Sequence, residues 1–306
     1  MQAPDYLSTD HLDKLIASAF AEDLGERGDV TTISTIPEDT QATATFLLKA
    51  DGIVAGIDVA NRIFAHLDSE VTTEWTVDDG EKAKAGTRIG TARGAARSLL
   101  VAERLALNVT QRMSGIATET ARYVAAVEGT SAQVLDTRKT APGLRALDKW
   151  AVALGGGSNH RIGLYDRILI KDNHIAACGG IAQAIHAGAK WRDANAPDLQ
   201  IECEARTLRE VRLAAATGLL DYLLLDNFAR MEDGILNVAP LEAALAEARA
   251  HDPEIRTDKR IQTEASGNVR LETVGEIART GVDFVSVGAL THSVTALDIS
   301  LNIDLV

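Results

Sequence analysis

Short apolar runs that end in a polar or small residue recur through the second half of this chain. Amphipathic segments with helical spacing separate several of them, such as Thr207–Thr217 ahead of Gly218 and Leu271–Thr280 ahead of Gly281. A glycine directly after a helix is a usual stop signal. The runs are Val134-Leu135-Asp136, Ile168-Leu169-Ile170-Lys171, Ile201-Glu202-Cys203-Glu204, Leu223-Leu224-Leu225-Asp226, Ile261 to Ser266, and Phe284-Val285-Ser286-Val287-Gly288. This alternation predicts a parallel sheet, open or closed into a barrel, with polar residues at the carboxyl ends of its strands, where such barrels carry their chemistry.

The first half of the chain shows a different pattern of apolar residues. Helical spacing runs from Asp10 to about Leu24, and a longer helical stretch covers about Ala95 to Val127, in which we expect an interruption at Gly115. Between them lie short runs typical of β-strands, separated by turns with Gly and Asp: Thr43–Leu48, Val71–Val77 and Arg88–Ala92.

Composition narrows the function. The net charge of −13 argues against a general binder of nucleic acid or of anionic membranes, which would need a basic face. No apolar stretch reaches the roughly 18–20 residues that span a bilayer. Cys178 and Cys203 form no metal-type or redox pair, and residues 1–10 lack the basic start and apolar stretch of a signal peptide. We therefore expect a cytoplasmic enzyme with no nucleic-acid or membrane partner.

A basic segment stands out from this acidic background. Residues 136–174 hold seven Lys or Arg against four Asp. Lys171 ends a fully apolar run and Arg161 follows three glycines, settings that are unusual for solvated surface charge. Arginine grips a carboxylate or phosphate with two parallel hydrogen bonds, and lysine adds a mobile point charge. Together with Arg138 and Lys139, these residues predict a pocket for a small, multiply negative substrate.

Acidic side chains come at neighbouring strand ends. Glu202 and Glu204 lie two apart on a predicted strand and so share one face, and Asp226 ends the next run. Such carboxylates could hold Mg²⁺ or accept hydrogen bonds from sugar hydroxyls. The alternative is that a glutamate merely neutralises a nearby cation.

Small residues at the last two strand ends suggest a phosphate site. Ser266-Gly267-Asn268 and Ser286-Val287-Gly288 would let backbone N–H groups approach a phosphate, although each could also be a tight turn. His160, beside Arg161, could stack on or hydrogen-bond an aromatic acid, although a lone histidine is more often structural. Arg104 lies beside Glu103 in the long helix, and spacing alone favours an ion pair there.

The chain contains none of the motifs G-x-x-x-x-G-K-[ST], G-x-G-x-x-G, H-E-x-x-H or G-x-S-x-G, which lowers the prospects of P-loop, dinucleotide, zinc-protease and serine-hydrolase chemistry. Instead, an ordered series of motifs closely resembles the quinolinate phosphoribosyltransferase family, also called nicotinate-nucleotide pyrophosphorylase (carboxylating). The matching stretches run nearly from end to end: Glu22-Asp23-Leu24, Asp29-Val30-Thr31-Thr32, Asp51-Gly52-Ile53-Val54-Ala55-Gly56, Glu103-Arg104-Leu105-Ala106-Leu107-Asn108, Ser114-Gly115-Ile116-Ala117, Thr137-Arg138-Lys139-Thr140, His160-Arg161, Lys171-Asp172-Asn173-His174, Glu202-Cys203-Glu204, Leu225-Asp226-Asn227, Glu264-Ala265-Ser266-Gly267-Asn268 and Ser286-Val287-Gly288.

The resemblance implies an α/β fold of two domains. Residues 1–117 would form an N-terminal α/β sandwich-like domain, residues 118–289 an open (β/α) barrel that carries the catalytic groups, and the tail of about 290–306 would pack back on the first domain. The implied reaction transfers phosphoribose from phosphoribosyl pyrophosphate (PRPP) to quinolinate with decarboxylation, giving nicotinate mononucleotide, CO₂ and pyrophosphate in NAD biosynthesis.

The resemblance also implies roles for individual residues. Arg138, Lys139, His160 and Arg161, with Thr140, would bind the quinolinate carboxylates, and Arg104 would join them from the neighbouring subunit of a homodimer. Four residues would be catalytic: Lys139 and Lys171 on the pyrophosphate, and Glu204 and Asp226 on Mg²⁺ and the ribose hydroxyls, directly or through water. The 5′-phosphate would lie against Ser266, Gly267 and Asn268 and against Ser286, Val287 and Gly288.

Two other functions remain open from the residues alone. One is a related phosphoribosyltransferase that acts on nicotinate or another acid without decarboxylation, for which one carboxylate should need fewer cations than this chain supplies. The other is a non-catalytic protein that binds anionic metabolites, which would not require Glu204 or Asp226.

Overall fold

The computed structural model describes residues 3–252 and 260–305. The chain divides into two compact units, each built from segments that are distant in sequence. The first comprises Met1–Ala121, Lys139–Gly156 and Ala289–Val306, and the second comprises Arg122–Arg138 and Gly157–Gly288. The sequence neighbours Arg138 and Lys139 therefore belong to different units.

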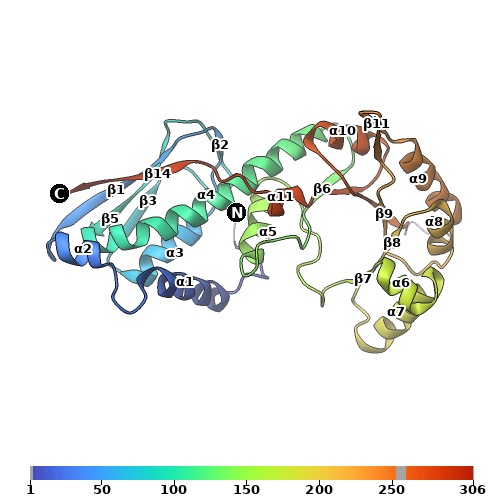
Figure 1. The fold of residues 1–306 in the computed structure, drawn as a ribbon, viewed down its shortest axis with the longest axis horizontal. Coiled ribbons are helices and arrows are strands. Elements are labelled where there is room, and N and C mark those ends of the chain that lie inside the picture. The colour runs from blue at the N-terminus through green and yellow to red at the C-terminus, as the bar shows by residue number, and fades with distance from the viewer. Residues whose placement is uncertain (1–2, 253–259, 306) are drawn as a thin grey trace. The chain divides into compact units, whose positions relative to one another are not determined.

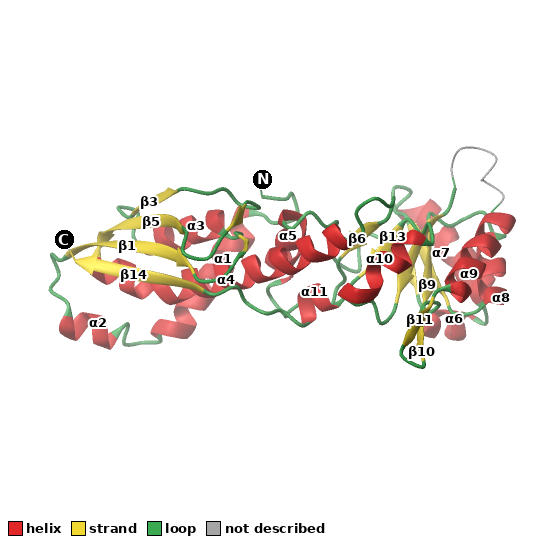
Figure 2. Cartoon of the chain, turned by 90° about the horizontal axis from the view of Figure 1, so that it is seen from above, coloured by secondary structure: helices red, strands yellow, loops and turns green. Residues whose placement is uncertain are grey.

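The first unit is built on a four-stranded antiparallel sheet. Its strand order is β14 (Ile299–Leu305), β1 (Gln41–Leu48), β5 (Arg88–Ala95) and β3 (Thr72–Trp75). Every second residue of β1 is buried, as expected of a strand with one face on the core. Helices α1 (Thr9–Leu24), α3 (Ile57–Leu67) and α4 (Ala96–Ala126) lie along one face of this sheet (Figures 1 and 2). An α/β N-terminal domain is thereby confirmed.

Short elements complete the first unit. They are α2 (Val30–Thr35), β2 (Gly52–Ile53), β4 (Lys82–Ala83), α5 (Arg145–Leu154) and α11 (Ala289–His292). Side-chain caps fix where the helices begin: Ser8 accepts a hydrogen bond from the His11 N–H ahead of α1, and Asp29 accepts from two N–H groups ahead of α2. Each cap satisfies backbone donors that the first helical turn leaves without an intrahelical partner.

The predicted interruption at Gly115 is wrong, because α4 continues through that residue. A β-carbon at position 115 would lie 2.2 Å from the carbonyl oxygen of Thr295 and 3.0 Å from the α-carbon of Ala296. Just beyond, the Leu297 N–H donates to the Gln111 carbonyl at 2.9 Å. Glycine at 115 therefore allows the segment that leads into β14 to lie directly against the helix, which is a tertiary requirement rather than a break in the helix.

The second unit holds a six-stranded parallel sheet. Its order is β6 (Gln133–Leu135), β13 (Phe284–Ser286), β12 (Gln262–Ser266), β9 (Tyr222–Asp226), β8 (Ile201–Ala205) and β7 (Ile168–Ile170). The first and last strands along the chain, β6 and β13, are neighbours, whereas β6 and β7 form the two edges and do not pair within the described residues. The barrel is therefore open, as predicted.

Helices and one hairpin surround this sheet (Figure 1). They are α6 (Asp172–Cys178), α7 (Ile181–Asn195), α8 (Leu208–Ala215), α9 (Ala239–His251), α10 (Leu271–Arg279), β10 (Arg230–Glu232) and β11 (Ile235–Asn237). Thr207 and Glu210 cap the start of α8 reciprocally, which is a capping box. The predicted glycine stops are confirmed, since Gly218 and Gly281 follow α8 and α10 with φ of +63° and +84°. Among the described residues, no helix is long and apolar enough to cross a membrane.

One buried ion pair attaches the segment after Lys139 to the rest of the first unit. The fully buried carboxylate of Asp148 on α5 accepts two hydrogen bonds from Arg112 on α4, at 2.7 and 2.8 Å. Its Oδ2 also accepts the Ala141 N–H at 3.3 Å. This bidentate pair therefore fixes both α5 and the turn that precedes it.

We expect the substitution Arg112→Met to lower the free energy of unfolding by about 3 kcal/mol, because it leaves a buried carboxylate without its guanidinium. Urea unfolding followed by circular dichroism measures the change. The matched control is Lys14→Met, which breaks the exposed pair between Lys14 and Asp10 and should cost less than about 1 kcal/mol. Equal losses in the two variants would contradict the importance of the buried pair.

Candidate active site

The carboxyl ends of the parallel strands gather most of the predicted site residues. Because neighbouring parallel strands end at the same edge of a sheet, side chains at or just after those ends lie close together. Those in the second unit are Lys171 after β7, Glu204 on β8, Asp226 on β9, Ser266 on β12 with Gly267 and Asn268, Ser286 on β13 with Val287 and Gly288, and Arg138, His160 and Arg161 on the loops between β6 and β7. Arg104, Lys139 and Thr140 belong to the first unit.

A buried aspartate directly after β6 holds in place the loop whose residues are predicted to bind the substrate carboxylates. Asp136 Oδ1 accepts the His160 N–H at 2.9 Å, and Oδ2 accepts the Asn159 side-chain amide at 2.7 Å. Asp136 is fully buried. The residues after β6 and the segment at His160 are thereby held together.

Arg138 and Arg161 are two nearby cations in this part of the unit. The Arg138 Nε is buried and has no hydrogen-bond partner among the described residues. Burial and the positive charge of Arg138 lower the pKa of Arg161. A buried donor without an acceptor is costly, and two guanidinium groups that disfavour each other would both be relieved by an anion. The pair is therefore suited to bind a carboxylate.

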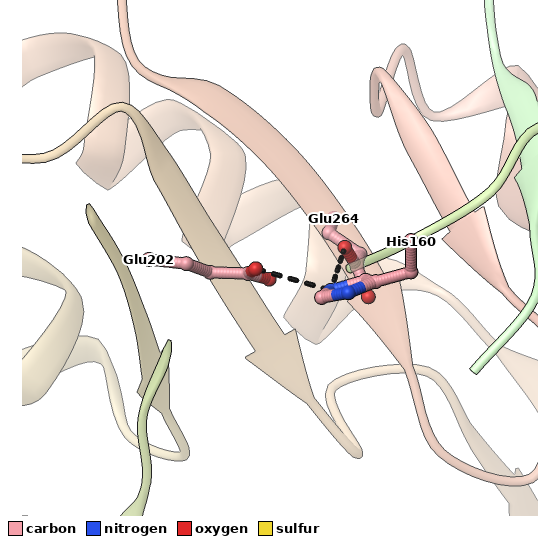
Figure 3. Close-up of side chains that lie close together, drawn as sticks. All are labelled: His160, Glu202 and Glu264. Carbon is pink, nitrogen blue, oxygen red and sulfur yellow. Dashed lines mark ion pairs between the residues drawn. The ribbon is translucent and has the colours of Figure 1, made fainter. Parts of the chain in front are cut away.

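His160 lies in a buried cluster with two glutamates from different strands (Figure 3). Its Nε2 is 3.0 Å from Glu202 Oε2 and 3.4 Å from Glu264 Oε2. Arg167 Nη1 lies 3.1 Å from the same oxygen of Glu202, and its guanidinium stacks 4.1 Å above the Tyr222 ring. Glu202 is on β8 and Glu264 on β12, so the strand order brings together groups that are far apart in sequence.

The cluster sets the charge of each member. Burial opposes the charged ring, but the carboxylates of Glu202 and Glu264 outweigh it and raise the pKa of His160 to about 9. Burial also acts against ionised Glu202, yet His160 and Arg167 overcome it and lower the pKa of that carboxyl. Burial and the charge of Glu202 raise the pKa of Glu264. We assign an imidazolium and an ionised Glu202 beside a Glu264 that favours its neutral form.

One contact opposes this assignment. The Arg161 N–H lies 2.7 Å from His160 Nδ1 in donor geometry, and only the neutral ring can accept it. The ionised carboxylate of Glu202 lies 3.0 Å from Nε2 inside the protein, where water screens its charge weakly, so its attraction for the imidazolium outweighs this contact.

The same three residues have ligand atoms within 4.8 Å of one another, which is close enough to hold a metal ion. At Glu202 a metal ion would meet the positive charge of Arg167, whose Nη1 lies 3.1 Å from Oε2. The carboxylate of Glu202 thus already contacts two groups of the protein itself, His160 and Arg167.

The second acidic group centres on Glu204. Its carboxylate is buried, with Oε2 3.4 Å from Lys171 Nζ and Oε1 2.9 Å from Arg206 Nη2. Arg206 also reaches Asp226 Oδ2 at 3.3 Å. Both Glu202 and Glu204 thus contact cations, as the alternative interpretation of the acidic residues expected. Their oxygen donors are nevertheless the kind that Mg²⁺ prefers, and the buried Glu204 Oε1 has no hydrogen-bond partner among the described residues.

In the turn after β12, the backbone at Gly267 lies very close to the side chain of Asn227. Gly267 has φ of +98°, and a β-carbon there would lie 2.1 Å from Asn227 Oδ1. The Asn268 side chain donates to the same oxygen at 3.2 Å. At the end of β13, the side chain of Val287 is buried and its N–H donates to the Leu135 carbonyl at 2.9 Å, so this N–H already has an acceptor in this conformation.

The three predicted site residues of the first unit lie at a cavity or on the surface of that unit. Lys139 and Thr140 line a cavity of about 420 Å³ together with Arg112 and His292. Arg104 is 62% exposed on α4, with its guanidinium 3.7 Å from Glu103.

Sequence reasoning missed three residues of these clusters, Glu264, Arg167 and Arg206, and it did not predict that Glu202 contacts His160. The two arginines flank strands and lie outside the motifs that carry the family resemblance, whereas Glu202 and Glu264 lie inside strands and within two of those motifs.

Comparison with known proteins identifies the family. The family model for the quinolinate phosphoribosyl transferase C-terminal domain matches residues 116–302, and the model for the N-terminal domain matches residues 29–114. "Quinolinate phosphoribosyltransferase [decarboxylating] 1b" of Nicotiana tabacum is 47% identical over 95% of this chain and 81% of its own. "Nicotinate-nucleotide pyrophosphorylase [carboxylating]" of Mycobacterium leprae is 41% identical over 94% of this chain and 95% of its own.

Solved structures agree. NadC from Streptococcus pyogenes has a TM-score of 0.86 and 35% identity over 98% of this chain and 99% of its own. Nicotinate-nucleotide pyrophosphorylase from Francisella tularensis has a TM-score of 0.85 and 37% identity over 97% of this chain and 98% of its own. The fold, the ordered motifs and these relatives agree from one end of the chain to the other, and the chain belongs to the quinolinate phosphoribosyltransferase family.

Proposed function

We propose that the protein transfers the phosphoribosyl group of PRPP to quinolinate, forming nicotinate mononucleotide and releasing pyrophosphate and CO₂. The observation that carries this proposal is Arg138, whose buried Nε lacks an acceptor beside a second guanidinium, that of Arg161. Relatives that match nearly the whole chain are named for this reaction, one in the decarboxylating and one in the carboxylating direction.

Quinolinate carries two adjacent carboxylates, and the cations of the site would bind both of them. A guanidinium binds a carboxylate in a planar, two-point geometry, so Arg138 and Arg161 would fix the plane of the ring. The His160 imidazolium would add a third positive charge close by. Such a clamp contributes to rate chiefly by holding the ring nitrogen against the sugar carbon that it attacks.

The acidic group would serve the sugar and the leaving group. As the pyrophosphate departs, positive charge develops at the sugar carbon, which Glu204 and Asp226 could stabilise electrostatically while they bind the ribose hydroxyls. Lys171 and Lys139 would neutralise the departing pyrophosphate. We propose that Glu204 and Asp226 also hold Mg²⁺, which when bound would absorb charge on the pyrophosphate.

The glycine turn after β12 and the end of β13 would bind the 5′-phosphate. The left-handed backbone at Gly267 lets this turn lie directly against Asn227, where a β-carbon would be 2.1 Å from Oδ1. Asn268 offers an amide donor beside it, and Ser286 and Gly288 would contribute from the neighbouring strand end.

We further propose a homodimer in which Arg104 enters the site of the partner subunit, and a cytoplasmic location. The exposed guanidinium of Arg104 and the unpaired thiols of Cys178 and Cys203 support these proposals.

Purified protein with PRPP and Mg²⁺ should convert quinolinate to nicotinate mononucleotide and release one CO₂ per product. The second carboxylate and the cationic ring nitrogen that forms on attachment make this loss favourable. Product formation is followed by chromatography, and CO₂ by release of label from the quinolinate carboxylate. Nicotinate is the control substrate and should react poorly; turnover of nicotinate but not quinolinate would overturn the proposal.

The pKa of His160 predicts how quinolinate use depends on pH. The folded pKa of about 9 exceeds the ordinary value of about 6.5, so the imidazolium and its attraction for a carboxylate persist at neutral pH and are lost as the pH rises through 9. We expect kcat/KM for quinolinate to fall above about pH 9. Glu202→Gln removes a carboxylate that favours the imidazolium and should move this fall to lower pH.

Two measurements check this prediction: the pH profile of kcat/KM and the NMR titration of the His160 ring. Glu272→Gln, which removes an exposed carboxylate on α10, is the matched control and should leave both unchanged. An unshifted His160 pKa in the Glu202→Gln variant would show that the cluster does not set the charge of the ring.

Shared sites predict complementation. Arg104→Ala and Lys139→Ala should each be nearly inactive alone, whereas mixed dimers would contain one site with neither substitution. Co-expression with two affinity tags isolates the mixed dimers, and we expect them to show about half of the wild-type rate, because one of their two sites is intact. Mixed dimers as inactive as the parent variants would argue against donation of Arg104 across the interface.

A further inference from the structure

Arg206 has no role in the proposed reaction, yet its guanidinium contacts three carboxylates at the strand ends. It follows β8, two residues after Glu204. Its Nη1 lies 2.8 Å from Asp172 Oδ2, its Nη2 lies 2.9 Å from Glu204 Oε1, and its Nε lies 3.3 Å from Asp226 Oδ2. Two of these partners are the carboxylates proposed above for Mg²⁺.

Two of these contacts, those with Glu204 and Asp226, are weak as hydrogen bonds. Glu204 Oε1 is buried and has no hydrogen-bond partner although Arg206 lies 2.9 Å away, so no N–H of the guanidinium points well at it. The bond to Asp226 is long, and half of the Arg206 side chain, 51%, is exposed. Water screens the exposed guanidinium, so Arg206 can move away from the site without itself becoming buried, and Lys171 stays 3.4 Å from Glu204 Oε2.

The site is therefore occupied by cations of the protein itself. Arg206 faces Glu204 Oε1, and Lys171 faces Glu204 Oε2 at 3.4 Å. Asp226 Oδ2, which accepts from Arg206, also accepts from the Asn227 side chain at 2.8 Å. A metal ion alone would have to compete with the positive charge of Arg206 for the same carboxylate oxygens.

We propose that Arg206 is a resident counter-ion that keeps free divalent cations out of this carboxylate site and admits a metal together with a diphosphate. The diphosphate would supply the oxygens to which Arg206 transfers, because the planar guanidinium fork matches phosphate as well as carboxylate. Arg206 would thus make the site bind a metal–diphosphate complex in preference to the free metal ion. This inference rests on the proposed function in one respect, the assignment of Glu204 and Asp226 as metal ligands.

The side chain can be changed without disturbing the start of the next helix. The bond that involves Arg206 in the α8 cap comes from its backbone N–H, which donates to Glu210 Oε2 at 2.8 Å. Thr207 and Glu210 complete that cap with each other. Arg206→Gln therefore removes the charge and keeps the cap.

Binding of Mn²⁺, followed by the EPR signal of the free ion, tests the proposal on the whole protein. Arg206→Gln should bind Mn²⁺ alone about tenfold more tightly than the wild type, because the competing charge is gone. The gain in Mn²⁺ affinity that inorganic pyrophosphate brings should fall about tenfold. Arg209→Gln, the same change at an exposed position of α8, is the matched control and should alter neither.

Two further variants make the result decisive. Adding Glu204→Gln to Arg206→Gln should abolish the tighter Mn²⁺ binding, which locates the ion at Glu204. Arg206→Lys keeps the charge without the fork, so it should bind Mn²⁺ alone as weakly as the wild type but lose part of the pyrophosphate effect. If Arg206→Gln fails to fold, Arg206→Lys decides alone, and an unchanged pyrophosphate effect in it overturns the proposal.

Unchanged Mn²⁺ affinity in a folded Arg206→Gln variant would equally overturn it. The proposed activity is judged separately, by wild-type turnover of quinolinate. A protein that converts quinolinate but shows no Arg206 effect refutes the counter-ion alone. One that shows the Arg206 effect without converting quinolinate refutes the activity alone.

Discussion

Charge balance at the strand ends of the open barrel is the constraint on which the rest of the site depends. Each carboxylate there lies against a cation: Glu202 against His160 and Arg167, and Glu204 against Lys171 and Arg206. Charged groups removed from water must be paired or they shift their protonation. Arg138, with its buried Nε lacking a hydrogen-bond partner among the described residues, departs from this rule. It therefore marks where an anionic substrate would complete the balance.

The sequence revealed the strands because the strands are buried on both faces and read as apolar runs. Lys171 and Asp226 were found in this way, each at the end of such a run. Partners across the sheet could not be found, since the contact of Glu202 with His160 and Glu264 depends on strand order, which periodicity does not encode. Arg206 follows a strand as an ordinary surface residue would. Gly115 was misread for a related reason, because local propensity predicts a break where packing requires closeness.

The two adjacent cations that begin the basic segment have different structural supports. Arg138 belongs to the second unit, whereas Lys139 begins a segment of the first. In the first unit, the Lys139 carbonyl accepts a hydrogen bond from Thr291, and the Asp148–Arg112 pair holds the helix that follows. Neighbouring residues of one sequence motif are therefore held by separate contacts in two compact units. A single cut along the chain cannot divide the protein into these units.

The charge state of His160 bears on how decarboxylation would proceed. An efficient general base has a pKa near the pH at which it works, and a ring with a pKa of about 9 is protonated there. His160 is thus suited to donate a hydrogen bond and to attract a carboxylate, and poorly suited to remove a proton. In the proposed reaction the ring nitrogen becomes cationic on attachment to the sugar, and this charge can accept the electrons that the departing carboxylate leaves behind. A proton must then replace the lost CO₂ on that ring carbon. Beyond this, the protein needs to supply orientation and a fixed field of charges, and the ionised Glu202 maintains that field by keeping His160 positive.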